Sequence, residues 1–168
     1  MYIDKSRTAC FSGHRPNKFP FSLDDKNCEG YKKLRFDIEC AIMQALNMGY
    51  DTFLCGMAKG FDLLCGEVAI ELRREQQYIQ LIAVLPNENK AFIGPWGELH
   101  RQIRRGANHE ISIQQDYSLG CFHYRNRFMI ENSSHIICYM NSDEGGTAYT
   151  VSMAEKQGLS VINLCQKN

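Results

Sequence analysis

The sequence predicts an α/β fold in which a mostly parallel sheet carries helices on both faces. Apolar, strand-like runs alternate regularly with segments of helical periodicity along all 168 residues, and this alternation is typical of parallel strands joined by right-handed crossovers. Three of the strand-like runs end in glycine and small polar residues just before a helical pattern begins. The length suits a single domain over residues 1–168.

The first strand is expected over 8–12, and an irregular polar segment follows it to about residue 30. The next element is a helix over 31–48, since apolar residues recur there every three or four positions and Gly49 stops the pattern. Its core-facing residues are expected to be Tyr31, Leu34, Ile38, Ala41, Ile42 and Ala45.

Two short strands flank the second helix. Residues 51–55 form the first of them, and a turn over 56–60 opens a helix that runs to about residue 75. Asp62 lies in the first turn of this helix, where a negative charge is favourable. Residues 78–85 are an apolar run ended by proline, which predicts the third strand.

The second half of the chain continues the alternation after a polar segment over 87–95. Apolar and polar residues alternate over 109–114, which is typical of a half-covered strand near the edge of a sheet. The run over 134–140 is strand-like throughout, and a glycine turn follows it directly. The remaining elements are expected as helices over 96–105, 119–132 and 147–157 and as a strand over 160–164.

Composition and charge narrow the class of protein. Nineteen basic and nineteen acidic residues cancel, which disfavours nucleic acid as a partner because a general polyanion binder carries a charged surface. Residues 1–5 lack the apolar region of a signal peptide, and no stretch approaches the roughly 20 apolar residues of a membrane span. The sequence therefore predicts a cytoplasmic protein without a membrane partner.

The eight cysteines contain no C-x-x-C pair, and the five histidines form no H-E-x-x-H element. No metal site is predicted from either set. The cysteines are expected as isolated core residues, above all Cys10, Cys55 and Cys138, which fall in or at the ends of strand-like runs and behave there as small hydrophobes.

Three turns from strand to helix carry the functional prediction: 12–15, 56–62 and 143–147. A helix N-terminus exposes backbone N–H groups and partial positive charge, so each turn suits an anion such as phosphate. The carboxyl ends of parallel strands meet at one edge of a sheet, and together the turns predict a nucleotide-sized cleft. No Walker A loop and no G-x-G-x-x-G fingerprint is present, which disfavours kinases, ATPases and ordinary dehydrogenases.

The turns differ in the groups that they offer. Gly145, Gly146 and Thr147 combine flexible backbone with a hydroxyl for phosphate oxygens, although a plain N-cap is an equally good interpretation of Thr147. Asp62 suits the hydroxyls of a ribose, with an ordinary capping role as the alternative.

Two arginines are candidates for the same cleft. Arg15 offers a guanidinium that grips a phosphate through two parallel hydrogen bonds. His14 beside it is an acid or base, or more simply a binding or packing residue. Arg125 shares a helix face with Met129, and it either borders the cleft or is a solvent-exposed arginine.

Four segments carry a family resemblance in their order and spacing: Ser12-Gly13-His14-Arg15-Pro16, Gly56-Met57-Ala58-x-Gly60-x-Asp62 with Glu67, Tyr124-Arg125-Asn126, and Gly145-Gly146-Thr147. Together they resemble the YpsA-like branch of the SLOG superfamily over nearly the whole chain. The resemblance implies a Rossmann-like three-layer sandwich that binds nucleotides or nucleotide-derived ligands such as ADP-ribose, NAD or AMP.

The LOG branch of the same superfamily contains phosphoribohydrolases, and its helix motif is similar to residues 122–129, with Asn126 where lysine is usual. Its second motif ends in a catalytic glutamate, where this chain has Thr150. A threonine cannot stabilise an oxocarbenium ion or activate water as a carboxylate does. Hydrolysis would therefore need a substitute carboxylate such as Asp62, Glu67 or Glu144.

The leading hypothesis is a binding protein for a nucleotide-type ligand, with a sensing or regulatory role and no further cofactor. The alternatives are a nucleotide N-glycosidase or phosphoribohydrolase, with Glu67, Asp62 and Arg125 as catalytic candidates, and, more weakly, DNA handling by analogy with the DprA branch. Related families commonly dimerise, which adds a homodimer as an expectation. The residues expected to bind the ligand are Ser12, Gly13, His14, Arg15, Gly56, Met57, Ala58, Gly60, Asp62, Arg125, Asn126, Gly145, Gly146 and Thr147.

Overall fold

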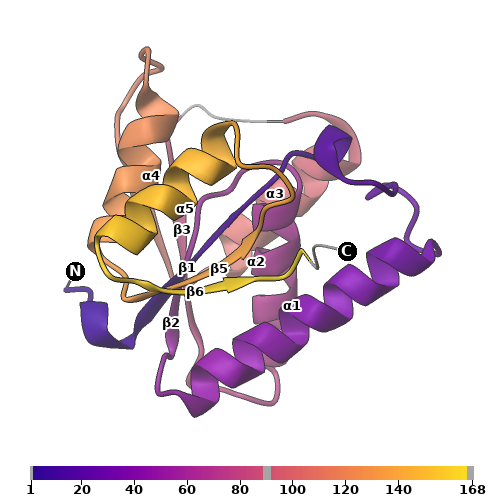
Figure 1. Ribbon diagram of the computed structural model, residues 1–168, viewed down its shortest axis with the longest axis horizontal. Coiled ribbons are helices and arrows are strands. Elements are labelled where there is room, and N and C mark those ends of the chain that lie inside the picture. Colours follow the sequence, from indigo (N-terminus) through magenta and orange to yellow (C-terminus); the bar gives the residue numbers. More distant parts are fainter. Residues whose placement is uncertain (1, 89–91, 166–168) are drawn as a thin grey trace.

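Six parallel strands form one sheet in the computed structural model, which describes residues 2–88 and 92–165 (Figure 1). The strand order is β4-β3-β2-β1-β5-β6, and every neighbouring pair is parallel. The chain therefore builds outward from β1 on one side and later returns to its other side with β5. The strands are β1 (Thr8–Gly13), β2 (Thr52–Cys55), β3 (Gln80–Leu85), β4 (His109–Ser112), β5 (His135–Tyr139) and β6 (Ser160–Asn163).

Helices cover both faces of this sheet, as the sequence predicts. One layer contains α1 (Glu29–Asn47), α2 (Phe61–Leu72) and α3 (Gly94–Gly106), and the other contains α4 (Cys121–Glu131) and α5 (Gly146–Lys156). Two short 3-10 helices, η1 (Lys5–Arg7) and η2 (Pro16–Lys18), precede and follow β1. No helix among residues 2–88 and 92–165 is long and apolar enough to cross a membrane.

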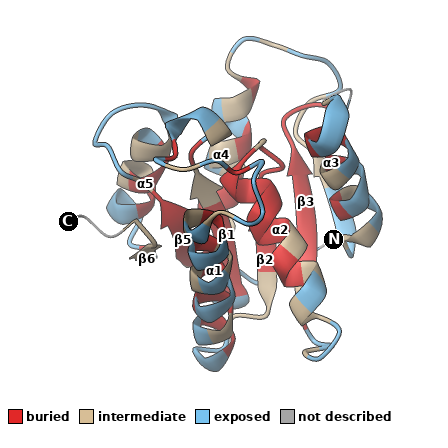
Figure 2. Ribbon diagram, turned by 90° about the vertical axis from the view of Figure 1, so that its right-hand side faces the viewer, coloured by how far each residue is buried: buried red, intermediate tan, exposed pale blue. Residues whose placement is uncertain are grey.

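The sheet separates a larger hydrophobic core from a smaller one, and its strands are buried between the helices in Figure 2. Ala9 and Phe11 of β1 belong to the larger core, whereas Cys10 between them belongs to the smaller one. This alternation follows from the two-residue period of a strand. Met129 of α4 and Val151 of α5 close the smaller core from outside.

The predicted elements are confirmed in kind and order. All six core-facing residues predicted for α1 are buried, and Gly49 has the positive φ of 95° that ends the helix segment. The strand predicted near an edge is β4, which is the edge strand beside β3. The α2 helix ends before the predicted limit near residue 75, because the chain turns there and the N–H of Gln76 bonds the carbonyl of Leu72 at 2.9 Å.

The cysteines are all free thiols, and most of them are buried. Cys10, Cys55 and Cys138 are core residues as predicted, and burial raises the pKa of each thiol to about 12. The prediction is wrong for Cys40, which is exposed on the outer side of α1. Its neighbours Ala41 and Ile42 occupy the core face instead.

Candidate functional site

A cavity of about 530 Å³ opens where β1 and β5 end. These two strands are neighbours in the sheet, but the chain leaves them in opposite directions, which makes this edge the topological switch point where α/β proteins bind ligands. The volume lies within the range of small-molecule and cofactor sites. The lining residues are Ser12, Gly13, His14, Arg15, Lys18, Ala58, Asp62, Phe122, His123, Arg125, Asn126, Asn141, Ser142, Glu144, Gly145, Gly146 and Thr147.

The N-terminus of α5 forms one wall of the cavity. Gly145 is the N-cap, with a φ of 94°, and no side chain caps the helix. The first N–H groups of a helix have no acceptor within the helix, so this end is left to a ligand or water. Thr147 lies inside the first turn, so its interpretation as the N-cap is wrong. A Cβ atom built on Gly146 would have no neighbour within 4 Å, which shows how open the wall is.

The turn after β1 forms another part of the cavity wall. Gly13 is required there, because a Cβ would lie 2.4 Å from the ring of Phe61. His14 is buried and its Nε2 accepts the N–H of Asn141 at 3.2 Å. Burial is the main cause that lowers the pKa of His14, so the neutral ring acts as an acceptor that ties this turn to the loop after β5. Arg15 is exposed beside it.

The β2–α2 turn reaches the cavity only through Ala58 and Asp62. Gly56, Met57 and Gly60 shape this turn from behind and do not line the cavity. Met57 is buried with a left-handed φ of 56°, a conformation that non-glycine residues rarely adopt. Gly60 has a φ of 105°, and a Cβ there would lie 2.6 Å from the carbonyl oxygen of His14.

Asp62 and Arg125 are the two buried charges at the cavity floor, with exposed fractions of 4% and 5%. Loss of solvent is the main cause that raises the pKa of Asp62, whereas Arg125, Arg15 and two backbone N–H groups oppose that shift. Nη1 of Arg125 donates to the carbonyl of Gly56. The buried position excludes the alternative of a solvent-exposed Arg125. The capping alternative for Asp62 is wrong, because no side chain caps α2 and Oδ2 of Asp62 instead accepts the N–H of Ala58, before the N-cap Gly60, at 3.4 Å.

A chain of hydrogen bonds links the β2–α2 turn to α5 through α4. Nε of Arg125 donates to Oδ1 of Asn126 at 2.8 Å, and Nδ2 of Asn126 donates to Oγ1 of Thr150 at 2.8 Å. The Thr150 hydroxyl in turn donates to the carbonyl of Gly146 at 2.9 Å. Thr150 is buried, and its neutral hydroxyl is occupied by these two hydrogen bonds within the protein.

Glu67 lies apart from the other predicted residues. It is on α2 and does not line the cavity. Its Oε2 accepts Nη1 of Arg35 from α1 at 2.6 Å, and Arg35 also pairs with Glu71. The carboxylate is therefore occupied in holding α1 against α2.

Several lining residues were missed in the sequence. Asn141 and Ser142 directly follow β5, a position that could have marked them, because residues just beyond parallel strands share one edge. Lys18 has no such signal, since it reaches the cavity through the irregular segment after β1. Among the described residues, no group of three histidine, cysteine or acidic side chains is placed to hold a metal ion.

Comparison with known proteins shows which family the sequence matches. The model of the YspA SLOG family (YpsA) matches residues 9–162. Among solved structures, the X-ray structure of DNA processing protein A (DprA) from Streptococcus pneumoniae superposes with a TM-score of 0.57 at 18% sequence identity, over 96% of this chain and 51% of that one. The chain thus spans about half the length of that protein, and the likeness shows the fold. No curated protein matches the chain.

Proposed function

The chain belongs to the YspA SLOG family, and on this basis we propose that it binds a nucleotide or nucleotide-derived ligand of the AMP, ADP-ribose or NAD type in the cavity between β1 and β5. Binding serves a sensing or regulatory role inside the cell. The phosphate lies on the N-terminus of α5, at Gly145, Gly146 and Thr147, and the ribose lies near Asp62.

The single observation that carries this proposal is the uncapped N-terminus of α5 opening into the cavity. Backbone N–H groups and the helix dipole both favour a phosphate there. Lys18, an exposed cation, lines the same cavity and forms no ion pair among the residues that the structure describes. Glu144, directly before the N-cap, is exposed and lines the cavity as well, so the backbone N–H groups and the helix dipole carry the preference for a phosphate.

Asp62 supports the placement of the ribose. Its carboxylate lines the cavity floor and is buried, so any hydroxyl that reaches it bonds without competition from solvent. A carboxylate only accepts hydrogen bonds, which matches the donors of a ribose diol.

Two variants of Gly146 test the proposal. Because space around this residue is open and its φ is not left-handed, both alanine and aspartate fit. Gly146→Asp places a carboxylate on the anion site, whereas Gly146→Ala adds only a methyl group. Wild type and Gly146→Ala should gain about 5–10 °C in melting temperature with AMP, ADP-ribose or NAD at about 100 times the dissociation constant.

Gly146→Asp should lose that shift while keeping its own melting temperature, since an acidic residue stabilises a helix N-terminus. Equal ligand shifts in the aspartate and alanine variants would exclude the α5 N-terminus as the phosphate site. The absence of any shift with all three ligands in folded wild type would overturn the proposal itself.

A second function, nucleotide N-glycosidase or phosphoribohydrolase, is favoured by one observation: Asp62 is a carboxylate at the cavity floor, whereas Thr150 supplies none. Asp62 would stabilise an oxocarbenium ion or activate water. Incubation with AMP, NAD and ADP-ribose tests it by release of free base. Asp62→Asn should abolish any release, and Glu67→Gln should not, because Glu67 is paired with Arg35 outside the cavity.

A further inference from the structure

We propose that the cavity contains a second anion-binding subsite, formed by the guanidinium groups of Arg15 and Arg125, and that the ligand therefore carries two phosphate groups. The inference rests on the proposed function, since it adds a second phosphate to the one on α5.

Arg125 is fixed in place but has hydrogen-bonding capacity left. Its Nε is bonded to Asn126 and its Nη1 to the carbonyl of Gly56. Within residues 2–88 and 92–165, no hydrogen bond involves Nη2. Only 5% of the residue is exposed, and it lines the cavity. Nη2 therefore remains available to an oxygen of a ligand in the cavity.

Arg15 lies over the same part of the cavity. The guanidinium carbons of Arg15 and Arg125 are 5.8 and 6.0 Å from the ring centre of Phe122. The two cations are close enough for Arg15 to lower the pKa of Arg125 by repulsion, although desolvation is the larger cause. Asp62 interacts electrostatically with both of them, so two guanidinium groups share one carboxylate. An anion bound here would relieve this repulsion.

This subsite is separate from the N-terminus of α5. Gly56, whose carbonyl holds Arg125, follows β2, whereas Gly145 follows β5, and β1 lies between these strands. The two places also offer different groups, side-chain guanidinium groups at the first and the backbone N–H groups of the first turn of α5 at the second. A ligand with two phosphate groups supplies an anion to each set of donors, whereas a ligand with a single phosphate leaves one set without an anion of its own.

Titration calorimetry with AMP, ADP and adenosine 3′,5′-bisphosphate tests the inference. ADP carries its two phosphates next to each other, and the bisphosphate carries them on either side of the ribose, so the two probes distinguish the spacing. In wild type at least one of them should bind about tenfold to a hundredfold more tightly than AMP, the gain expected for one charge-assisted contact.

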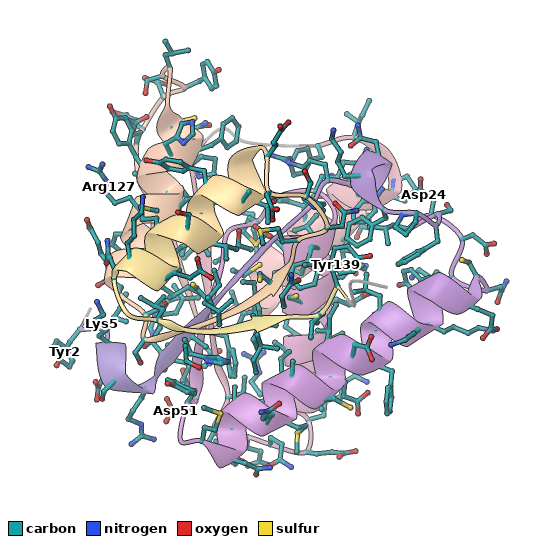
Figure 3. The ribbon with its side chains drawn as sticks, in the orientation of Figure 1. Tyr2, Lys5, Asp24, Asp51, Arg127 and Tyr139 are labelled. Carbon is teal, nitrogen blue, oxygen red and sulfur yellow. The ribbon has the colours of Figure 1, made fainter. Side chains whose placement is uncertain are left out.

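Arg15→Gln is the diagnostic variant, because Arg15 is exposed and its replacement leaves the core intact. It should remove the advantage of the two-phosphate ligands and leave the affinity for AMP unchanged. Arg127→Gln is the matched control, since Arg127 is an exposed arginine that points away from the outer side of α4 (Figure 3) and does not line the cavity. It should leave all three affinities unchanged.

Four results would overturn the inference. The proposed function stands and the second subsite fails if AMP binds and neither two-phosphate ligand binds more tightly. The subsite also fails if Arg15→Gln keeps the advantage, or if it weakens AMP as much as the other ligands. Absence of binding by all three probes to folded wild type would overturn the proposed function together with the second subsite.

Discussion

Replacement of Gly56 by alanine tests the arrangement of charges at the cavity floor. A Cβ at this position would lie 2.6 Å from Oδ2 of Asp62 and 2.8 Å from Nη1 of Arg125, whereas ordinary contact begins at 3.4 Å. Each charged group must therefore move by about 0.6 to 0.8 Å. Gly56 does not have a positive φ, so the cost comes from this overlap rather than from the backbone.

The overlap should break the hydrogen bond from Arg125 to the carbonyl of Gly56. A hydrogen bond to a charged group contributes about 1.5–3 kcal/mol. We therefore expect Gly56→Ala to lose about 2–3 kcal/mol of unfolding free energy, which for a chain of this size is about 4–12 °C in melting temperature. Urea unfolding should show a lower midpoint with an unchanged slope.

Gly146→Ala is the matched control, because it is the same substitution in open space. Its unfolding free energy should stay within about 0.5 kcal/mol of wild type or rise by up to about 1 kcal/mol through reduced freedom of the unfolded chain. If Gly56→Ala is less than about 0.5 kcal/mol below this control, Asp62 and Arg125 do not pack against Gly56, and the described floor is wrong.

Three further predictions concern the surroundings of the cavity. Thr150→Val should cost about 1 kcal/mol, and a double-mutant cycle with Asn126→Ala should show coupling between the two side chains, which strict additivity would contradict. Burial lowers the pKa of both His14 and His135, so the unfolded chain binds more protons below about pH 6.5 and the unfolding free energy should fall as pH drops below that value. His135→Phe should flatten this slope between about pH 6.5 and 5.5 in urea titrations, and an unchanged slope would refute the assignment. A thiol reagent should react fastest with Cys40, which is the exposed thiol, whereas Cys28 and Cys165 are partly buried and the other five are buried; a fast phase that persists in Cys40→Ser would contradict this order of reactivity.

The fold was predictable because its signals are local. The apolar face of α1 is visible in the spacing from Tyr31 to Ala45, and Gly49 marks its end without reference to any other part of the chain. The edge position of β4 was predictable for a similar reason, since its alternating polar residues require solvent on one side.

For the cavity, the sequence predicted the backbone turns that form its walls but not the positions of its side chains. Turns after β1 and β5 carry glycines that mark them in the sequence, and parallel pairing brings them to one edge. The side chains depend on distant partners. Arg125 is buried because Gly56, 69 positions earlier, leaves room for it and accepts its hydrogen bond. Glu67 is withdrawn from the cavity by Arg35. No local pattern contains either pairing.

The separation of the two cores by the sheet has a mechanical consequence. The cavity walls at Asp62 and the first turn rest on the larger core, whereas those on α4 and α5 rest on the smaller one. A ligand held by both sides would join two layers that pack independently, and so oppose the sliding of α4 and α5 across the sheet. Binding of a ligand in this cavity would then restrict the motion of α4 and α5 relative to the sheet. Such a change in mobility could signal that the ligand is bound without any chemical step.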